Sequence, residues 1–150
     1  MSRNRAVAIV IHHNKLLVMH RKNDKEYYTF PGGGIEAGET NEQATIREIK
    51  EEASLDIEVE KLVYELHHDN GDIHYYFLCR YLKGEIAVQP GTNEYADNEL
   101  GRDIHQPLWL PLQDVSKSIL YPFEVRDRLI IDKMQNFSNQ VVRLDLPAMS

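Results

Sequence analysis

Short hydrophobic runs alternate with polar turns along the first third of the chain. Apolar runs at 6–11 and 16–19 flank a polar turn at 13–15, and this pattern predicts a β-hairpin. A charged segment at 21–26 follows and leads to the aromatic stretch 27–30, after which the chain becomes rich in glycine.

Helical periodicity begins after the glycine run. Thr40 followed by Gln43 is the signature of a capping box, so we expect a helix that begins at Thr40. At about 100° per residue, three apolar side chains fall on the face where a core would pack: Ile46, Ile49 and Ala53. Three carboxylates fall on roughly the opposite face: Glu48, Glu51 and Glu52.

The middle of the chain has the pattern of a second hairpin. Strand-like runs at 57–67 and 73–82 are joined by 69–72, which contains an Asn-Gly dipeptide typical of tight hairpin turns. A turn at 83–85 then leads into a short apolar run at 86–88.

The last part of the chain combines a loop, two short strands and a helix. The polar stretch 89–106 has no clear period, and we expect a surface loop of a length that often carries function. A short strand is predicted at 107–111, a helix at 122–135 and an edge strand at 141–146. The helix would bury one side, made of Val125, Leu129, Ile130 and Met134.

Composition bounds the class of protein and its compartment. The 150 residues have the size of one domain, which we expect to span 1–150. The formal net charge of -7 argues against a long nucleic acid as partner, because neutralising its phosphates needs clustered basic side chains. The lone cysteine, Cys79, lies in a strand-like run and fits a reducing compartment. The first apolar run is too short for a signal peptide or a membrane span, so we expect a soluble, cytoplasmic protein without a membrane partner.

The three carboxylates on one helix face form a candidate cation site. Oxygen ligands of this kind suit hard divalent cations. Like charges three and four residues apart on a helix repel by roughly a few tenths of a kcal/mol per pair. A bound cation would turn that repulsion into attraction.

The segment 31–55, PGGGIEAGETNEQATIREIKEEASL, resembles the Nudix box, the signature of hydrolases that act on a nucleoside diphosphate linked to another moiety. The box positions are filled in register by Gly33, Glu39, Arg47, Glu48, Ile49, Glu51, Glu52 and Leu55. The single departure is Ser54, where the family has glycine. The chain is thus similar to the Nudix hydrolase superfamily (MutT-like), with no subfamily assigned. The resemblance implies an α/β fold, namely a Nudix-type α/β/α sandwich with a central mixed β-sheet.

The resemblance also implies a metal centre. The cation would be Mg²⁺, or alternatively Mn²⁺, and its ligands would be Glu48, Glu51, Glu52 and the carbonyl of Gly32. The general base would be Glu48 or an acidic residue of the 89–106 loop. In that loop Glu94 is preferred, Glu99 is second, and Asp97 and Asp103 are left open.

Other box residues would support the metal ligands. The resemblance implies that Arg47 organises the loop and the carboxylates, with Glu39 as its structural partner in the site. Its guanidinium stays charged at every working pH. Ser54 would cost roughly 1 kcal/mol if it had to take a left-handed conformation at the end of the helix. We expect a local adjustment of the helix end there, without loss of activity.

Substrate contacts are predicted around the glycine run. Gly33 and Gly34 would allow phosphate to approach the main chain closely. Arg21 is a candidate phosphate contact. Tyr28, or its neighbour Tyr27, is a candidate aromatic beside the substrate pocket, with core packing as the competing interpretation.

Two functional classes are consistent with the sequence. We favour a metal-dependent pyrophosphohydrolase that acts on a nucleoside triphosphate or a related small nucleotide, because every charged box position is intact. The alternative is a non-catalytic nucleotide-binding or regulatory module. The histidines are expected on strand surfaces, with His67 or His74 as candidates to line the cleft, and Trp109 is expected in the core. Either a monomer or a homodimer is compatible with the sequence.

Overall fold

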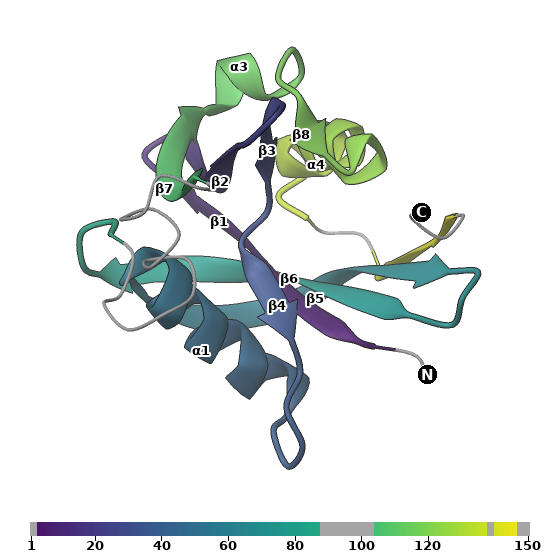
Figure 1. Ribbon diagram of the computed structural model, residues 1–150. Helices are drawn as coiled ribbons and strands as arrows, with labels where there is room; N and C mark the ends of the chain where they lie inside the picture. The colour runs from purple at the N-terminus through teal and green to yellow at the C-terminus, as the bar shows by residue number, and fades with distance from the viewer. Residues whose placement is uncertain (1–2, 88–103, 138–139, 147–150) are drawn as a thin grey trace.

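The computed structural model describes residues 3–87, 104–137 and 140–146 (Figure 1). Its strands are β1 (Arg5–His12), β2 (Lys15–Lys22), β3 (Glu26–Thr29), β4 (Gly32–Gly34), β5 (Asp56–His68), β6 (Ile73–Lys83), β7 (Ile104–Pro111), β8 (Leu120–Tyr121) and β9 (Val142–Leu146). Its helices are α1 (Asn41–Ala53), α3 (Leu112–Val115) and α4 (Phe123–Met134).

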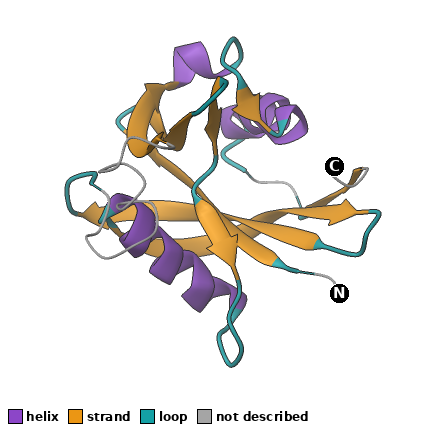
Figure 2. Ribbon diagram, viewed as in Figure 1, coloured by secondary structure: helices purple, strands orange, loops and turns teal. Residues whose placement is uncertain are grey.

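A curled, mixed β-sheet forms the centre of the molecule, with helices on both sides (Figure 2). The strand order is β8-β3-β2-β1-β6-β5-β9, while β4 pairs with β1 and β7 pairs with β2. Helix α1 covers one side, and α3 and α4 lie on the other (Figure 2). The predicted class, an α/β sandwich around a mixed sheet, is confirmed.

Strand β1 is buried on both faces. Val7 and Ile9 belong to the core cluster that includes side chains of α4, whereas Ala8 and Val10 belong to the cluster that includes side chains of α1. A strand covered on both sides needs apolar residues at every position. This explains why its sequence is a continuous apolar run and not an alternating one.

Both predicted hairpins are confirmed. Strands β1 and β2 pair antiparallel with His12 opposite Lys15, and β5 pairs antiparallel with β6. Helix α4 falls within the predicted 122–135, and β9 is the edge strand expected at 141–146, paired parallel to β5.

The predicted capping box also forms. The Thr40 hydroxyl accepts the Gln43 N–H at 3.0 Å, and the Gln43 side-chain oxygen accepts the Thr40 N–H at 2.9 Å. These two bonds satisfy donors that a helix start leaves unpaired, so α1 begins directly after Thr40.

Three predictions about element limits and burial are wrong. The expected loop at 89–106 ends too late, because β7 already begins at Ile104 and pairs with β2 from there. Ile46 is 43% exposed, since α1 packs through Ala44, Thr45, Ile49 and Ala53 and leaves Ile46 beside that stripe. Met134 is 82% exposed at the last position of α4, and the buried residue of that turn is Asp132.

The end of α1 departs from expectation in another way. Ser54 takes a left-handed conformation, with φ 61° and ψ 28°, and its N–H donates to the Lys50 carbonyl at 3.1 Å. The expected local adjustment is absent, because serine adopts the conformation that the family's glycine would take. The helix therefore closes normally, at a cost of roughly 1 kcal/mol.

Two single-residue predictions about the core hold. Cys79 is buried, which raises the pKa of its thiol to about 12. Trp109 is half-buried and packs against the cluster that includes α1. Among the described residues, no helix combines the length and the apolar character that crossing a membrane requires.

Candidate active site

Strand β4 places three glycines between β1 and the carboxylates of α1. It pairs antiparallel with β1, with Ala6 opposite Gly33 and Val7 opposite Gly32. A Cβ on Gly32 would lie 2.4 Å from the Ala6 carbonyl oxygen, and a Cβ on Gly33 would lie 2.5 Å from the carboxylate of Glu48. A side chain at Gly32 would clash with the main chain of β1, whereas a side chain at Gly33 would displace the carboxylate of a candidate metal ligand.

Arg47 is the organising cation of the site. Its guanidinium holds Glu39 with two bonds, Nε to Oε2 at 2.7 Å and Nη2 to Oε1 at 2.9 Å. Nη1 donates to Glu48 at 2.9 Å and to Glu51 at 3.4 Å, and Nη2 donates to the Gly34 carbonyl at 3.0 Å. One side chain thus ties the glycine strand, the loop and the helix together, while its role in catalysis stays a prediction.

Burial and hydrogen bonding shift the pKa values of two carboxylates of the site in opposite directions. The Glu48 side chain is 13% exposed, and this burial raises its pKa, although the Arg47 bond and charge partly oppose the shift. Hydrogen bonds from the Arg47 side chain and the Glu36 main chain lower the pKa of Glu39 to about 2. Glu39 is therefore the ionised counter-ion of Arg47, whereas burial makes Glu48 easier to protonate than a free glutamate.

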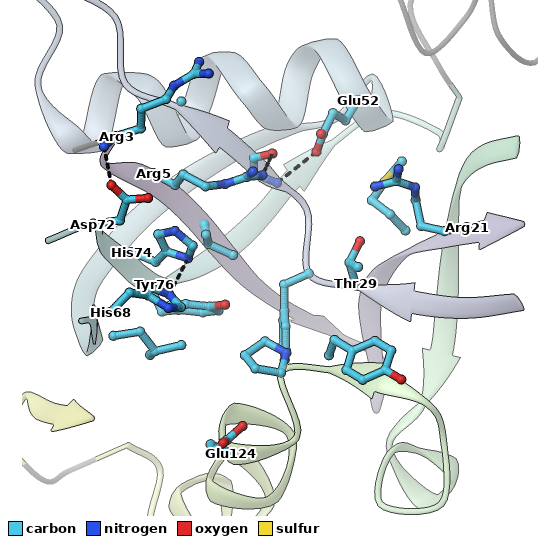
Figure 3. Close-up of a pocket in the computed structure, with 18 of the residues that line it drawn as sticks. Arg3, Arg5, Arg21, Thr29, Glu52, His68, Asp72, His74, Tyr76 and Glu124 are labelled. Carbon is cyan, nitrogen blue, oxygen red and sulfur yellow. Dashed lines mark hydrogen bonds between the residues drawn. The ribbon is translucent and has the colours of Figure 1, made fainter. Parts of the chain in front are cut away.

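Glu52 and Arg5 bind the two main-chain polar groups of Gly32 in the glycine strand. The Gly32 N–H donates to Glu52 Oε2 at 2.9 Å. Arg5 Nη2 donates to the Gly32 carbonyl at 3.2 Å (Figure 3). The carbonyl expected from the sequence to be a metal ligand is thus already an acceptor for an arginine.

The oxygen donors fit a hard divalent cation in chemistry. Among the described residues, no three acidic, histidine or cysteine side chains are gathered closely enough to form a metal cluster. Glu48 and Glu51 turn toward Arg47, and Glu52 turns toward Gly32. Their side chains would have to reorient to share one cation, but all come from neighbouring turns of α1 and carry only oxygen ligands, as Mg²⁺ prefers.

A cavity of about 720 Å³ opens beside these residues (Figure 3). Arg21, Gly32, Gly34 and Glu52 line it, as predicted for site residues. Its other lining residues are Arg3, Arg5, Val7, Met19, Thr29, Phe30, Leu66, His68, Asp72, His74, Tyr76, His105, Tyr121, Pro122, Phe123 and Glu124. The size is that of a small-molecule site.

The other predicted substrate residues lie outside the cavity lining. Tyr28 is half-buried, packs against the core cluster of α4 and lies 5.4 Å from the His20 ring, measured between centroids. Gly33 contacts Glu48 instead of the cavity. Of the two histidine candidates, His74 lines the cavity, while His67 bonds to Glu65 at 2.9 Å. Glu94, Glu99, Asp97 and Asp103 lie outside the described residues.

Several lining residues were not anticipated from the sequence. Arg5 is the first residue of β1 and precedes the apolar run, and no motif marks it. Tyr76 shares the face of β6 with His74, so the two-residue period of a strand could have found it. Tyr121 and Phe123 flank the start of α4, and no motif marks them.

Comparison with known proteins gives a family match over most of the chain. The family model of the NUDIX domain matches residues 2–134. An ADP-ribose pyrophosphatase of Methanocaldococcus jannaschii is 48% identical over 52 residues, which are 33% of this chain and 31% of that protein. The 8-oxo-dGTP diphosphatase of Proteus vulgaris is 33% identical over 86 residues, or 53% of this chain and 77% of that protein. The match therefore spans less than a third of the archaeal relative.

A solved structure supports the fold over nearly the full length. The crystal structure of an ADP-ribose pyrophosphatase from Streptococcus suis has a TM-score of 0.69 and 21% sequence identity. The similarity covers 97% of this chain and 100% of that one. At this identity the likeness concerns the fold alone.

Proposed function

This chain belongs to the NUDIX domain family, and on that premise we propose that it is a divalent-cation-dependent pyrophosphohydrolase. Its substrate would be a small nucleotide, most simply a nucleoside triphosphate, in which it cleaves a phosphoanhydride bond. The observation that carries the proposal is the bonding of Arg47 to Glu39, Glu48 and Glu51 beside a cavity that Glu52 lines.

The α1 carboxylates would hold the cation, with Gly32 as a further ligand. A bound Mg²⁺ or Mn²⁺ neutralises phosphate charge and lowers the pKa of a bound water. Glu48 would accept the proton, because a carboxylate beside the cation lies within reach of the water that the cation would activate. Arg47 would fix the direction of that carboxylate, and Glu94 is the alternative base.

The cations of the cavity would hold the phosphates. Arg5 and Arg21 both line it, within a chain whose formal net charge is -7. Two relatives carry names that refer to nucleoside diphosphate derivatives, ADP-ribose and 8-oxo-dGTP. These names support a nucleotide substrate and leave the choice between a triphosphate and a sugar nucleotide to experiment.

A nucleotide panel tests the proposal. The purified chain is incubated with nucleoside triphosphates and sugar nucleotides in Mg²⁺ or in EDTA, and the released products are identified. We expect Mg²⁺-dependent cleavage that falls at least 100-fold in Glu52→Gln. The control is Glu58→Gln, an exposed carboxylate paired with Arg80 on the sheet, which should act like wild type. If wild type leaves every nucleotide intact in Mg²⁺ but still binds one, the protein is a binding module and not an enzyme.

A further inference from the structure

The floor of the cavity is made by three neighbouring strands of the sheet. Alternate side chains of a strand share one face, so each strand contributes two residues to the floor. In register, Val7 of β1 lies opposite Tyr76 of β6, and Arg5 lies opposite His74. Strand β5 adds Leu66, which pairs with His74, and His68. The floor therefore combines polar and apolar side chains in neighbouring rows.

Tyr76 is a buried phenol whose hydroxyl has no hydrogen-bond partner among the described residues. The residue is 3% exposed, and its ring packs against Phe30 at 5.6 Å and Tyr64 at 6.4 Å between centroids. The neighbouring phenol differs, because the Tyr64 hydroxyl donates to Asp132 at 2.7 Å. In Figure 3 the Tyr76 oxygen points into the cavity.

A hydroxyl that faces the cavity and has no partner among the described residues is available to a bound ligand. Burial raises the pKa of Tyr76, so this phenol stays protonated and can both donate and accept a hydrogen bond. The charge of Arg5 opposes this rise in pKa, and the charge of Glu124 adds to it.

The two ends of the cavity differ in chemistry. Arg21 and Glu52 lie at the end of the cavity nearer α1, whereas Glu124 lies at the opposite end (Figure 3). At that far end the rings of Tyr121 and Phe123 stack on each other, with centroids 4.8 Å apart and planes at 16°. The Arg126 guanidinium sits 4.2 Å from the Phe123 centroid. These contacts fix the two rings as an apolar wall.

We propose that the heteroaromatic base of the nucleotide occupies this cavity and that the Tyr76 hydroxyl bonds to a polar atom on the edge of the base. The inference rests on the proposed function, because it takes the phosphates to lie by Arg21 and Glu52. A planar base has apolar faces that suit the side chains of Val7, Leu66 and Phe123. Its polar edge can hydrogen-bond to the phenol, which an aliphatic chain cannot do.

The test compares Tyr76→Phe with Tyr75→Phe. The first change removes one oxygen from the cavity, and the second removes one from the opposite face of the same strand, where Tyr75 packs against the other core cluster. Calorimetry in Mg²⁺ measures the Kd of four methylene-bridged nucleoside triphosphates, which resist hydrolysis, and of inorganic tripolyphosphate. We expect Tyr76→Phe to weaken the tightest nucleotide about 3- to 10-fold, as for one lost neutral hydrogen bond. Tripolyphosphate should bind both variants as it binds wild type.

Three outcomes would overturn the inference. They are nucleotide binding by Tyr76→Phe equal to wild type, equal weakening of nucleotide and tripolyphosphate, and no binding of any nucleotide analogue by wild type. An unchanged Tm confirms that Tyr76→Phe folds, since its oxygen bonds to no described residue. Failure of the proposed function is separate, because it would appear as absent hydrolysis while the analogue Kd values still respond to Tyr76.

Discussion

Replacing Gly33 with alanine should disable the site without unfolding the protein. The new Cβ would lie 2.5 Å from both Cδ and Oε1 of Glu48, whereas ordinary contacts begin at 3.4 Å. The Glu48 carboxylate must therefore retreat by about 0.9 Å. A displacement of about 1 Å in a catalytic group can lower the rate on the order of 100-fold, which corresponds to about 2.7 kcal/mol in the activation barrier.

The two flanking glycines provide matched comparisons for the same substitution. A Cβ on Gly34 meets only the Arg3 guanidinium at 3.8 Å, an ordinary contact, so Gly34→Ala should lose far less activity. A Cβ on Gly32 meets the main chain of β1 at 2.4 Å and 2.7 Å, so Gly32→Ala should lower Tm as β4 separates from β1. Alanine at the three positions should therefore have three different effects: a lower Tm at Gly32, lost activity at Gly33 and little change at Gly34.

The assay is steady-state cleavage of the best nucleotide together with thermal unfolding. Gly33→Ala should keep its Tm, because Gly33 has ordinary strand geometry and the atoms in its way end a flexible side chain. Its kcat should fall while that of Gly34→Ala falls little. Equal kcat in these two variants would refute the steric reasoning, as would a Tm for Gly33→Ala as low as that of Gly32→Ala.

Three further predictions concern stability. Ser54→Gly should raise the free energy of unfolding by roughly 1 kcal/mol, because glycine takes the left-handed conformation without strain; a lower Tm would contradict this. Tyr64→Phe should cost about 1–3 kcal/mol in urea unfolding, because Asp132 loses its buried phenol partner, and no change in the midpoint would count against that bond. Burial, with the charges of His68 and Arg5, lowers the pKa of His74 from 6.5 to about 4, so between those values the unfolded chain binds a proton that the folded chain does not. Stability should therefore fall as pH drops from 6.5 to 4, and Tm against pH should be flatter in His74→Asn.

Local sequence signals predicted the parts of the fold that local interactions specify. The Thr40–Gln43 capping box needs only four consecutive residues, and the two hairpins need only a turn between apolar runs. Strand β4 has no hydrophobic pattern, because it consists of three glycines. At two of them a Cβ would lie too close to β1 or to Glu48. Its pairing with β1 depends on residues far away in the sequence, and no local rule predicts that pairing.

The residues of the candidate site also fall into a group that local sequence predicts and a group that depends on long-range contacts. The box gave the carboxylates and Arg47 with their spacing, because one helix and its preceding loop carry all of them. The cavity depends on β1, β5, β6 and the start of α4, which only the sheet brings together. The helical period also predicted Met134 in the core, because the period alone does not show where the sheet beneath the helix ends.

The first three residues of β1 limit how far the protein can be shortened at its N-terminus. Residues Arg5 to Val7 pair with β4 on one side and with β6 on the other. Removing residues 1–7 would look harmless if only the Nudix box were considered, because the box begins well after them. It would strip the glycine strand of its neighbour and remove the buried side chains of Ala6 and Val7, so both stability and catalysis should fall.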